Sequence, residues 1–324
     1  MDTFVPIFTD IVLPVLLLVG VGSLLQKFKP LDILTLTKVT VWLLVPSFLF
    51  VKVYESHLTW GQIFGIAGAL LAPMIVVAGI MYVILHKMRV PGAELSAMIM
   101  GAVVVNAGNF GIPVAQLLYG DGPAAGEPVM MFPGMTKAAD GVAVQALCVL
   151  ISNLVLWCFG YIVISLAKGK GWRGAMGYFK LPMIYAMALA FILRDNGIAL
   201  PKVAAFPLQM LTDATVPVML ITLGAQLVKS ARWPRWKIVL PVAAIKLIVM
   251  PLVTWPLVIA FGMWPWPGIQ LVISAAGPAA VNVLLITLEL EGDAELAADC
   301  VFWSTVFCAL TCTVCIALAS IVAV

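Results

Sequence analysis

The sequence predicts an all-α polytopic membrane protein with ten transmembrane helices arranged as two inverted five-helix repeats. The first observation is composition: of 324 residues, 63% are hydrophobic and 10% charged, with a mean hydropathy of +1.13. Soluble domains are about 45–50% apolar and about 25% charged. The second is that the apolar runs have the length of a helical span, about 20 residues, which exceeds that of a barrel strand. The third is that similar features recur in the same order in both halves.

Ten apolar runs, joined by short connections, are candidate spans. They cover residues 4–26, 33–53, 61–85, 95–118, 139–167, 181–199, 205–228, 238–262, 267–289 and 296–323. No basic segment precedes the first run and no small-residue cleavage site follows it. We therefore expect this run to be a permanent helix rather than a signal peptide.

Basic residues indicate the orientation of the spans. Loops 1–2, 3–4, 5–6 and 7–8 contain Lys27, Lys29, Lys87, Arg89, Lys168, Lys170, Arg173, Lys180, Lys229, Arg232, Arg235 and Lys237. The opposite side keeps only Lys52, Lys137, Arg194 and Lys202. The positive-inside rule makes the richer side cytoplasmic, so we expect both termini outside.

The two halves, residues 1–167 and 168–324, resemble one another. The matching pairs are Val45-Pro46 with Val216-Pro217, Pro73 with Pro251, Asp140 with Asp299, and Gly111-Ile112-Pro113 with Ala276-Gly277-Pro278. An odd number of spans in each half inserts the second half upside down. Inverted repeats with paired interrupted helices are typical of secondary transporters, which bind their substrate where the breaks meet.

The breaks in spans 4 and 9 are the candidate binding site. Pro removes a helix hydrogen bond, and Gly lets the backbone bend. We expect the positive ends of the two second half-helices to converge in mid-membrane, where asparagine amides add donors for an anion such as a carboxylate. The candidate substrate-binding residues are Asn106, Gly108, Asn109, Gly111, Pro113, Gly277, Pro278 and Asn282. The alternative is a simple proline kink whose polar groups are hydrogen-bonded by neighbouring helices.

Spacing places these residues on helix faces. Asn106, Asn109 and Pro113 are expected to share one face of span 4. By the same reasoning, Ser274, Pro278 and Asn282 are expected to share one face of span 9.

Ionisable residues within spans are candidates for coupling or gating. Asp140 and Asp299 lie near the starts of spans 5 and 10, where capping of the helix N-terminus is an equal alternative. Lys246, in the middle of span 8, is expected either to pair with a carboxylate or to meet the anionic substrate. Lys38, near the start of span 2, is expected to extend towards the cytoplasm.

Two glutamines are weaker candidates. Gln145, one turn into span 5, is expected to line the cavity. Gln226 is expected to face the substrate pathway, although close helix packing through Gly224 explains the same LGAQL motif.

Three segments resemble the auxin efflux carrier family, which includes the plant PIN carriers and many bacterial organic-anion carriers. They are VNAGNFGIPVAQLLYG (105–120), VPVMLITLGAQL (216–227) and GPAAVNVLLITLELEGD (277–293). The resemblance covers nearly the whole chain, and its most specific part is the asparagine–glycine–proline string in the first segment.

The resemblance implies a sodium/proton antiporter-like fold in which spans 4 and 9 cross at their breaks. It also implies a scaffold of spans 1, 2, 6 and 7, often dimeric, and a transport domain of spans 3–5 and 8–10. The resemblance also implies that the crossover positions that bind a substrate carboxylate in the family correspond to Asn109, Pro113, Pro278 and Asn282. The long loop between spans 5 and 6 of many plant members is missing, which favours a bacterial-type carrier.

Together these features predict a secondary transporter of a small organic anion, a malonate-like or auxin-like carboxylate, working by an elevator type of alternating access. An anion channel and a proton- or sodium-coupled carrier of another substrate class are the alternatives. No catalytic pair, metal cluster or glycine-rich phosphate loop is found in the sequence, so we expect no enzyme, no metal and no cofactor beyond a coupling ion. The expected partners are the substrate, membrane lipid and a second copy of the chain, without nucleic acid.

Overall fold

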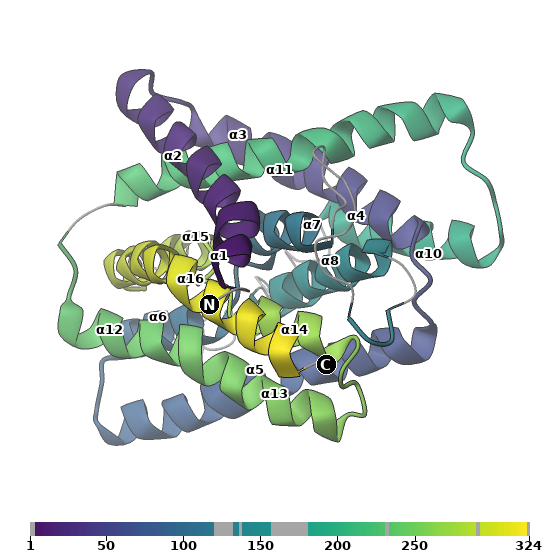
Figure 1. Cartoon of the computed structure of the whole chain (residues 1–324). Helices are drawn as coiled ribbons and strands as arrows, with labels where there is room; N and C mark the ends of the chain where they lie inside the picture. Colours follow the sequence, from purple (N-terminus) through teal and green to yellow (C-terminus); the bar gives the residue numbers. More distant parts are fainter. Residues whose placement is uncertain are drawn as a thin grey trace.

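The computed structural model describes residues 4–119, 132–135, 138–156, 181–230, 233–289 and 292–322. Within these residues, every regular element is a helix (Figure 1). In the described part of the chain, six helices are long and apolar enough to cross a membrane: Phe4–Phe28, Ile33–Tyr54, Trp60–Lys87, Lys202–Val228, Trp236–Ala260 and Ala294–Val322. The chain is therefore a multi-pass membrane protein, as composition predicts.

The long helices follow the predicted spans to within a few residues. They consist of α1 (Phe4–Ile7), η1 (Phe8–Val12) and α2 (Leu13–Phe28); α3 (Ile33–Val39), η2 (Thr40–Leu44) and α4 (Val45–Tyr54); α5 (Trp60–Lys87); α11 (Lys202–Ser230); α12 (Trp236–Ala244), η6 (Ile245–Val249) and α13 (Met250–Ala260); and α16 (Ala294–Val322).

Shorter helices occupy the other four predicted spans. These are α6 (Gly92–Val103), η3 (Ala107–Gly111) and α7 (Ile112–Tyr119); α8 (Ala138–Leu154); α10 (Pro182–Asp195); and α14 (Gly268–Ala275) with α15 (Asn282–Glu289). Residues 157–167 of the fifth predicted span, and the boundary between the two proposed repeats, lie outside the described residues. The same holds for Lys137, Lys168, Lys170, Arg173, Lys180 and Arg232, which entered the orientation argument.

Among the described residues, four short π-helices precede prolines. Each one, η1, η2, η3 and η6, ends two residues before Pro14, Pro46, Pro113 or Pro251 respectively. Proline has no N–H, and its ring clashes with the carbonyl four residues earlier. A wider turn moves that carbonyl away, so the helix continues past the proline instead of breaking.

Figure 1 shows α2, α4, α10 and α11 along one side of the molecule and α5, α12 and α13 along the opposite side. The helices α6, α7, α8, α14, α15 and α16 lie between these groups. The helices α2 and α11 approach closely because Gly22 faces the backbone of Ile221, and Gly224 faces that of Val19. Ser23 Oγ also donates to the Gly224 carbonyl at 3.0 Å.

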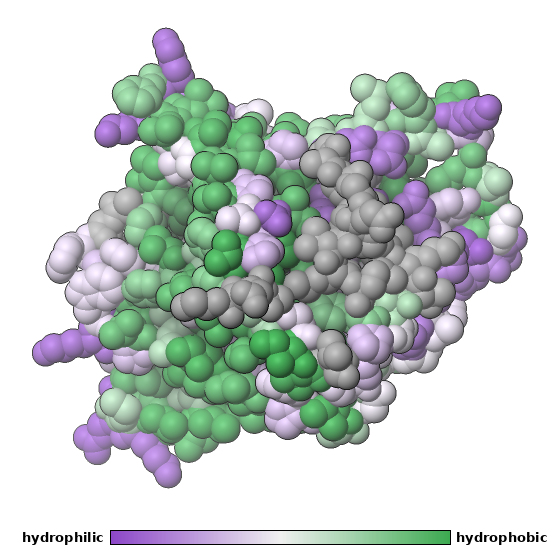
Figure 2. Space-filling model, in the orientation of Figure 1, coloured by the Kyte–Doolittle hydropathy of each residue, from purple (hydrophilic) through white to green (hydrophobic). Residues whose placement is uncertain are grey.

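The surface is consistent with a lipid environment. On the face drawn in Figure 2, hydrophobic residues dominate the described surface, and most strongly hydrophilic residues lie towards its edges. Large exposed apolar side chains include Leu17, Leu24, Ile75 and Leu252. Such a continuous apolar exterior is unusual for a soluble monomer.

Candidate functional site

Two broken helices cross in the middle of the molecule. The chain is non-helical at Val104–Asn106, between α6 and η3, and again between α14 and α15. The two segments pair as an antiparallel bridge between Val105 and Ala279. Asn106 N donates to the Pro278 carbonyl at 2.8 Å, and Ala280 N donates to the Val104 carbonyl at 3.1 Å. These bonds satisfy backbone groups that lipid could not satisfy.

The break in the fourth predicted span lies earlier than the sequence suggested. Its position was expected at Gly111-Ile112-Pro113, but Pro113 lies in the first turn of α7. The π turn of η3 accommodates this proline, and Gly111 N donates to the Asn106 carbonyl at 3.0 Å. The chain unwinds instead at Val104–Asn106, where the partner segment supplies hydrogen bonds.

This shift corrects the predicted helix faces. Asn106 precedes η3 and does not share a helix face with Asn109 and Pro113. Pro278 lies in the non-helical segment, so it shares no helix face with Ser274 and Asn282. The break at Ala276-Gly277-Pro278 itself lies where it was predicted.

A cavity of about 230 Å³ lies against the crossing. It is smaller than the pockets of about 300–1,000 Å³ that hold drug-sized ligands. The polar residues that line it are Thr37, Lys38, Thr40, Asn106, Asn109, Ser152, Asn153, Thr222, Gln226 and Asn282. Of the predicted residues, Asn106, Gly108, Asn109, Asn282 and Gln226 line the cavity, whereas Gly111, Pro113, Gly277 and Pro278 are not among its lining residues.

Two lining amides carry buried atoms that lack a partner. Among the described residues, Asn106 Nδ2 and Gln226 Oε1 have no hydrogen-bond partner, and Asn106 is only 4% exposed. A buried unsatisfied polar group costs about 1–3 kcal/mol. Such a group calls for an explanation, and its position on a cavity wall points to a ligand.

Helix ends and one cation make the cavity attractive to anions. The η3–α7 helix begins at Ala107 and α15 begins at Asn282, both at the cavity wall. The first amides of a helix have no intrahelical acceptor and carry a partial positive charge. Asn282 Nδ2 also lies 3.5 Å from Asn153 Oδ1. Lys38 is the one charged residue among the described lining residues.

Comparison with known proteins agrees with this membrane architecture. A family model described as membrane transport protein matches residues 175–316. Over these residues the chain is similar to the membrane transport protein family. This finding confirms the resemblance to the auxin efflux carriers.

Two similar proteins are named as uncharacterized transporters. One, from Methanothermobacter thermautotrophicus, is 23% identical over 309 residues, covering 92% of this chain and 94% of its own. The other, from Methanocaldococcus jannaschii, is 24% identical over 314 residues, with the same shares of 92% and 94%. The family match and the relatives together indicate that this chain is a transporter rather than an enzyme.

Lys246 is not among the residues that line the cavity. It is fully buried, and its Nζ donates to the carbonyl of Ala275, the last residue of α14, at 3.2 Å. Neither of the expected partners, a carboxylate or the cavity, is found beside it in the described part of the chain. A cation is favourable at a helix C-terminus because the last carbonyls carry partial negative charge.

The two symmetric aspartates also lie outside the cavity lining. Asp140, in the first turn of α8, accepts from the backbone N–H of His57 at 3.0 Å and thereby contacts the connection between α4 and α5. Capping does not account for Asp299, which is buried five residues after the start of α16. Asp293 caps that helix instead, because its Oδ1 accepts from Leu296 N at 2.9 Å.

Sequence reasoning missed several residues of the site. Lys38 was expected to reach the cytoplasm and was not assigned to the cavity. Asn153, an amide within an apolar span, carried a usable signal, since polar groups inside spans usually face the protein interior. Gln145 was expected to line the cavity but donates instead to the Ala107 carbonyl at 2.8 Å.

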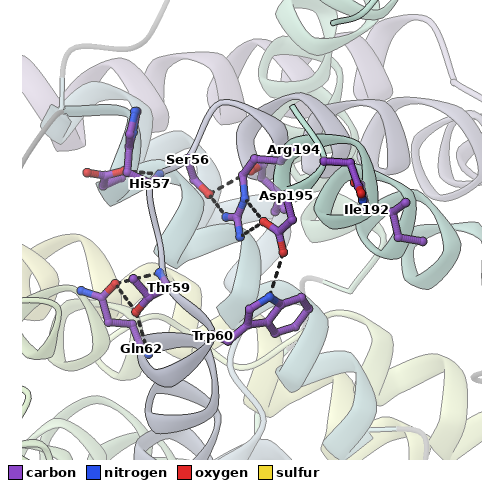
Figure 3. A network of polar contacts seen from close by, with 11 residues as sticks. Ser56, His57, Thr59, Trp60, Gln62, Ile192, Arg194 and Asp195 are labelled. Carbon is purple, nitrogen blue, oxygen red and sulfur yellow. Dashed lines mark hydrogen bonds and ion pairs between the residues drawn. The ribbon is translucent and has the colours of Figure 1, made fainter. Parts of the chain in front are cut away.

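A second polar cluster lies at the end of α10 opposite to Met183 (Figure 3). At the end of α10, Asp195 Oδ2 accepts from Trp60 Nε1 at 2.8 Å, and its Oδ1 lies 2.8 Å from Arg194 Nη2. Arg194 Nη1 donates to Ser56 Oγ at 3.1 Å. Met183, at the start of α10, lines the cavity. The rise of a helix places Arg194 and Asp195 about 17–18 Å along α10 from Met183.

Proposed function

We propose that this chain is a secondary transporter of a small organic anion, a malonate-like or auxin-like carboxylate, which binds at the crossing of the broken helices. The observation that carries the proposal is the unpartnered Asn106 amide on the wall of a cavity at the start of two half-helices. A carboxylate would accept from that amide, and Asn109 and Asn282 offer further amide groups on the same wall. Two positive helix ends favour its charge.

The proposed topology is ten spans in two inverted repeats, residues 1–167 and 168–324, with both termini outside a bacterial inner membrane. Local symmetry at the crossing supports it. Gln145 and Ser304 each lie five residues after the paired aspartates Asp140 and Asp299. Gln145 binds the backbone next to one break, and Ser304 Oγ accepts from Ala279 N in the other at 3.0 Å.

The proposed mechanism is an elevator movement of a transport domain, formed by spans 3–5 and 8–10, against a scaffold of spans 1, 2, 6 and 7. The position of the cavity supports this division. Thr37 and Gln226 line it from the scaffold helices, and Asn106 and Asn282 line it from the transport helices. A ligand there would contact both parts and respond to their relative movement. We further propose that a homodimer forms through the scaffold helices.

The conformation described here is proposed to face the cytoplasm. Lys38, in the last turn of α3 and in the first half of the span Ile33–Tyr54, and Gln226, near the end of α11, lie towards the basic loops and line the cavity. The cluster of Ser56, Trp60 and Asp195 lies at the opposite end, between the connection of spans 2 and 3 and the end of α10. Opening to the outside would require these contacts to break.

The experiment has two stages. A thermal-shift screen of small carboxylates, including malonate and indole-3-acetate, finds a ligand of the purified protein. Counterflow of that ligand in proteoliposomes, with and without proton or sodium gradients, then tests transport and coupling. Saturable counterflow supports a carrier, and gradient dependence identifies a coupling ion. Conductive flux that does not saturate would overturn the carrier in favour of an anion channel.

A further inference from the structure

Three buried hydrogen bonds connect the end of α7 to the crossing. Tyr119 Oη donates to Gln270 Oε1 at 2.6 Å, Gln270 Nε2 donates to Gln145 Oε1 at 2.7 Å, and Gln145 Nε2 donates to the Ala107 carbonyl at 2.8 Å. All three side chains are at most 1% exposed. The series joins α7, α14 and α8 to the first residue of η3.

Chemistry fixes the direction of this series. The Ala107 carbonyl can only accept, so Gln145 must present its NH₂ group there and its oxygen to Gln270. Gln270 must then donate to that oxygen and present its own oxygen to the hydroxyl of Tyr119. Each amide orientation therefore follows from the one before it, which makes the arrangement sensitive to a single change of donor into acceptor.

The backbone leaves room for the glutamine. A Cβ on Gly111 would collide with Gln145 Nε2, and a Cβ on Gly141 would collide with the ring of Tyr119. Glycine at these two positions therefore lets α8 and its amide approach the η3–α7 helix. The approach brings Gln145 next to the residue that follows Asn106.

We propose that Gln145 is a positioning residue for the substrate site. Both backbone groups of Asn106 are hydrogen-bonded: its N–H donates to the Pro278 carbonyl, and its carbonyl accepts from Gly111 N. Gln145 donates to the next carbonyl along the chain, that of Ala107. These bonds keep the unpartnered Asn106 amide on the cavity wall, where a carboxylate would accept from it. The inference rests on the proposed function, because it assigns Gln145 to the proposed binding site.

Purified Gln145→Leu, Gln145→Glu and Gln270→Glu variants test the assignment. Leu cannot donate, whereas a carboxyl group donates only when protonated, and a buried one keeps its proton to higher pH than in water. The matched control is Gln26→Glu, since Gln26 is also buried and its Oε1 accepts from Leu31 N at 2.9 Å, a role that a carboxylate retains. Gln270→Glu removes the donation to Gln145 Oε1 once its carboxyl group is ionised, and it serves if a Gln145 variant does not fold.

Two readouts separate positioning from general damage. The first is hydrogen–deuterium exchange of residues 104–111 in the ligand-free protein. The second is the affinity for malonate and for indole-3-acetate at about pH 6 and about pH 9, a range that brackets the titration of a buried carboxyl group.

We expect Gln145→Leu to raise exchange in that segment and to weaken binding about tenfold at both pH values. Gln145→Glu should bind like the wild type at the lower pH and about tenfold more weakly at the higher one. Binding by Gln145→Glu that is equal at both pH values, or unchanged exchange in Gln145→Leu, would overturn the positioning role. A wild type that binds neither probe refutes the proposed substrate classes, while the exchange result still decides the role of Gln145.

Discussion

Val105 and Ala279, which are 174 positions apart in the sequence, face each other in an antiparallel bridge where two broken helices cross. The bridge resolves the main difficulty of interrupting a helix inside a membrane protein, because each unwound segment satisfies the backbone of the other. It also places Asn106 directly beside the paired residues and at the cavity wall. The energetic cost of the break is thus concentrated in side-chain amides that a ligand can satisfy.

Replacing Asn106 with leucine should stabilise the empty protein and impair binding. The unpartnered amide costs about 1–3 kcal/mol, and an apolar side chain of similar size removes that cost. We expect Asn106→Leu to raise the melting temperature of the ligand-free protein and to abolish stabilisation by malonate or indole-3-acetate. Differential scanning fluorimetry measures both effects. A lower melting temperature with retained ligand stabilisation would contradict this account of Asn106.

The two lysines near the crossing should behave differently. Lys38→Gln removes the cation that lines the cavity and should weaken anion binding by about two- to fivefold, the effect of an exposed charge. Lys246→Gln should leave affinity unchanged, because Lys246 contacts the end of α14 rather than the cavity. Isothermal titration calorimetry at low and high salt compares the anion affinities of the two variants. A larger loss of affinity in Lys246→Gln than in Lys38→Gln would reverse the assignment.

Close packing of α2 on α11 gives a prediction about stability. An added methyl group in Gly224→Ala meets the backbone of Val19, and overpacking of this kind costs about 1–3 kcal/mol. Gly20→Ala is the matched control, because a Cβ there has no atom within 4 Å. Thermal unfolding in detergent should show a lower melting temperature for Gly224→Ala and an unchanged one for Gly20→Ala. Equal effects would mean that the helix contact is looser than described.

The cluster of Figure 3 should favour the conformation in which the cavity faces the cytoplasm. Trp60→Phe removes the hydrogen bond to Asp195 but keeps an aromatic ring beside Phe191. Loss of one such bond, about 1 kcal/mol, should shift the conformational equilibrium about fivefold towards the outside. A cysteine introduced by Thr37→Cys at the cavity reports the shift through slower labelling from the cytoplasmic side. The control is Trp255→Phe, because the Trp255 ring stacks on Trp264 outside this cluster. Unchanged labelling in Trp60→Phe would argue against a role of the cluster in closing the outer end.

Much of the fold follows from hydrophobicity alone. The predicted ranges 61–85 and 296–323 correspond to Trp60–Lys87 and Ala294–Val322. Where the prediction was wrong, the cause was local geometry: Pro113 was interpreted as a break, yet the π turn before it keeps the helix continuous. A proline pattern in the sequence does not distinguish a widened turn from an unwound segment.

Of the candidate site, only the residues that belong to the sequence motif could be predicted. Asn106, Asn109 and Asn282 were identified from the motif and line the cavity. The contacts of Gln145 with Ala107 and Gln270 depend on the packing of three helices, which periodicity does not encode. The role of the three asparagines in substrate binding stays a prediction.

Ligand affinity of asparagine variants tests the central claim most directly. Malonate and indole-3-acetate are titrated into the wild type, Asn109→Ala and Asn282→Ala. The control is Asn196→Ala, just after α10, because the Asn196 side chain donates to the Ile192 carbonyl of that helix and does not line the cavity. We predict that the wild type and the control bind the same carboxylate equally, while each cavity variant binds at least about tenfold more weakly and still unfolds cooperatively. Unchanged affinity in both cavity variants would contradict a substrate site at the crossing.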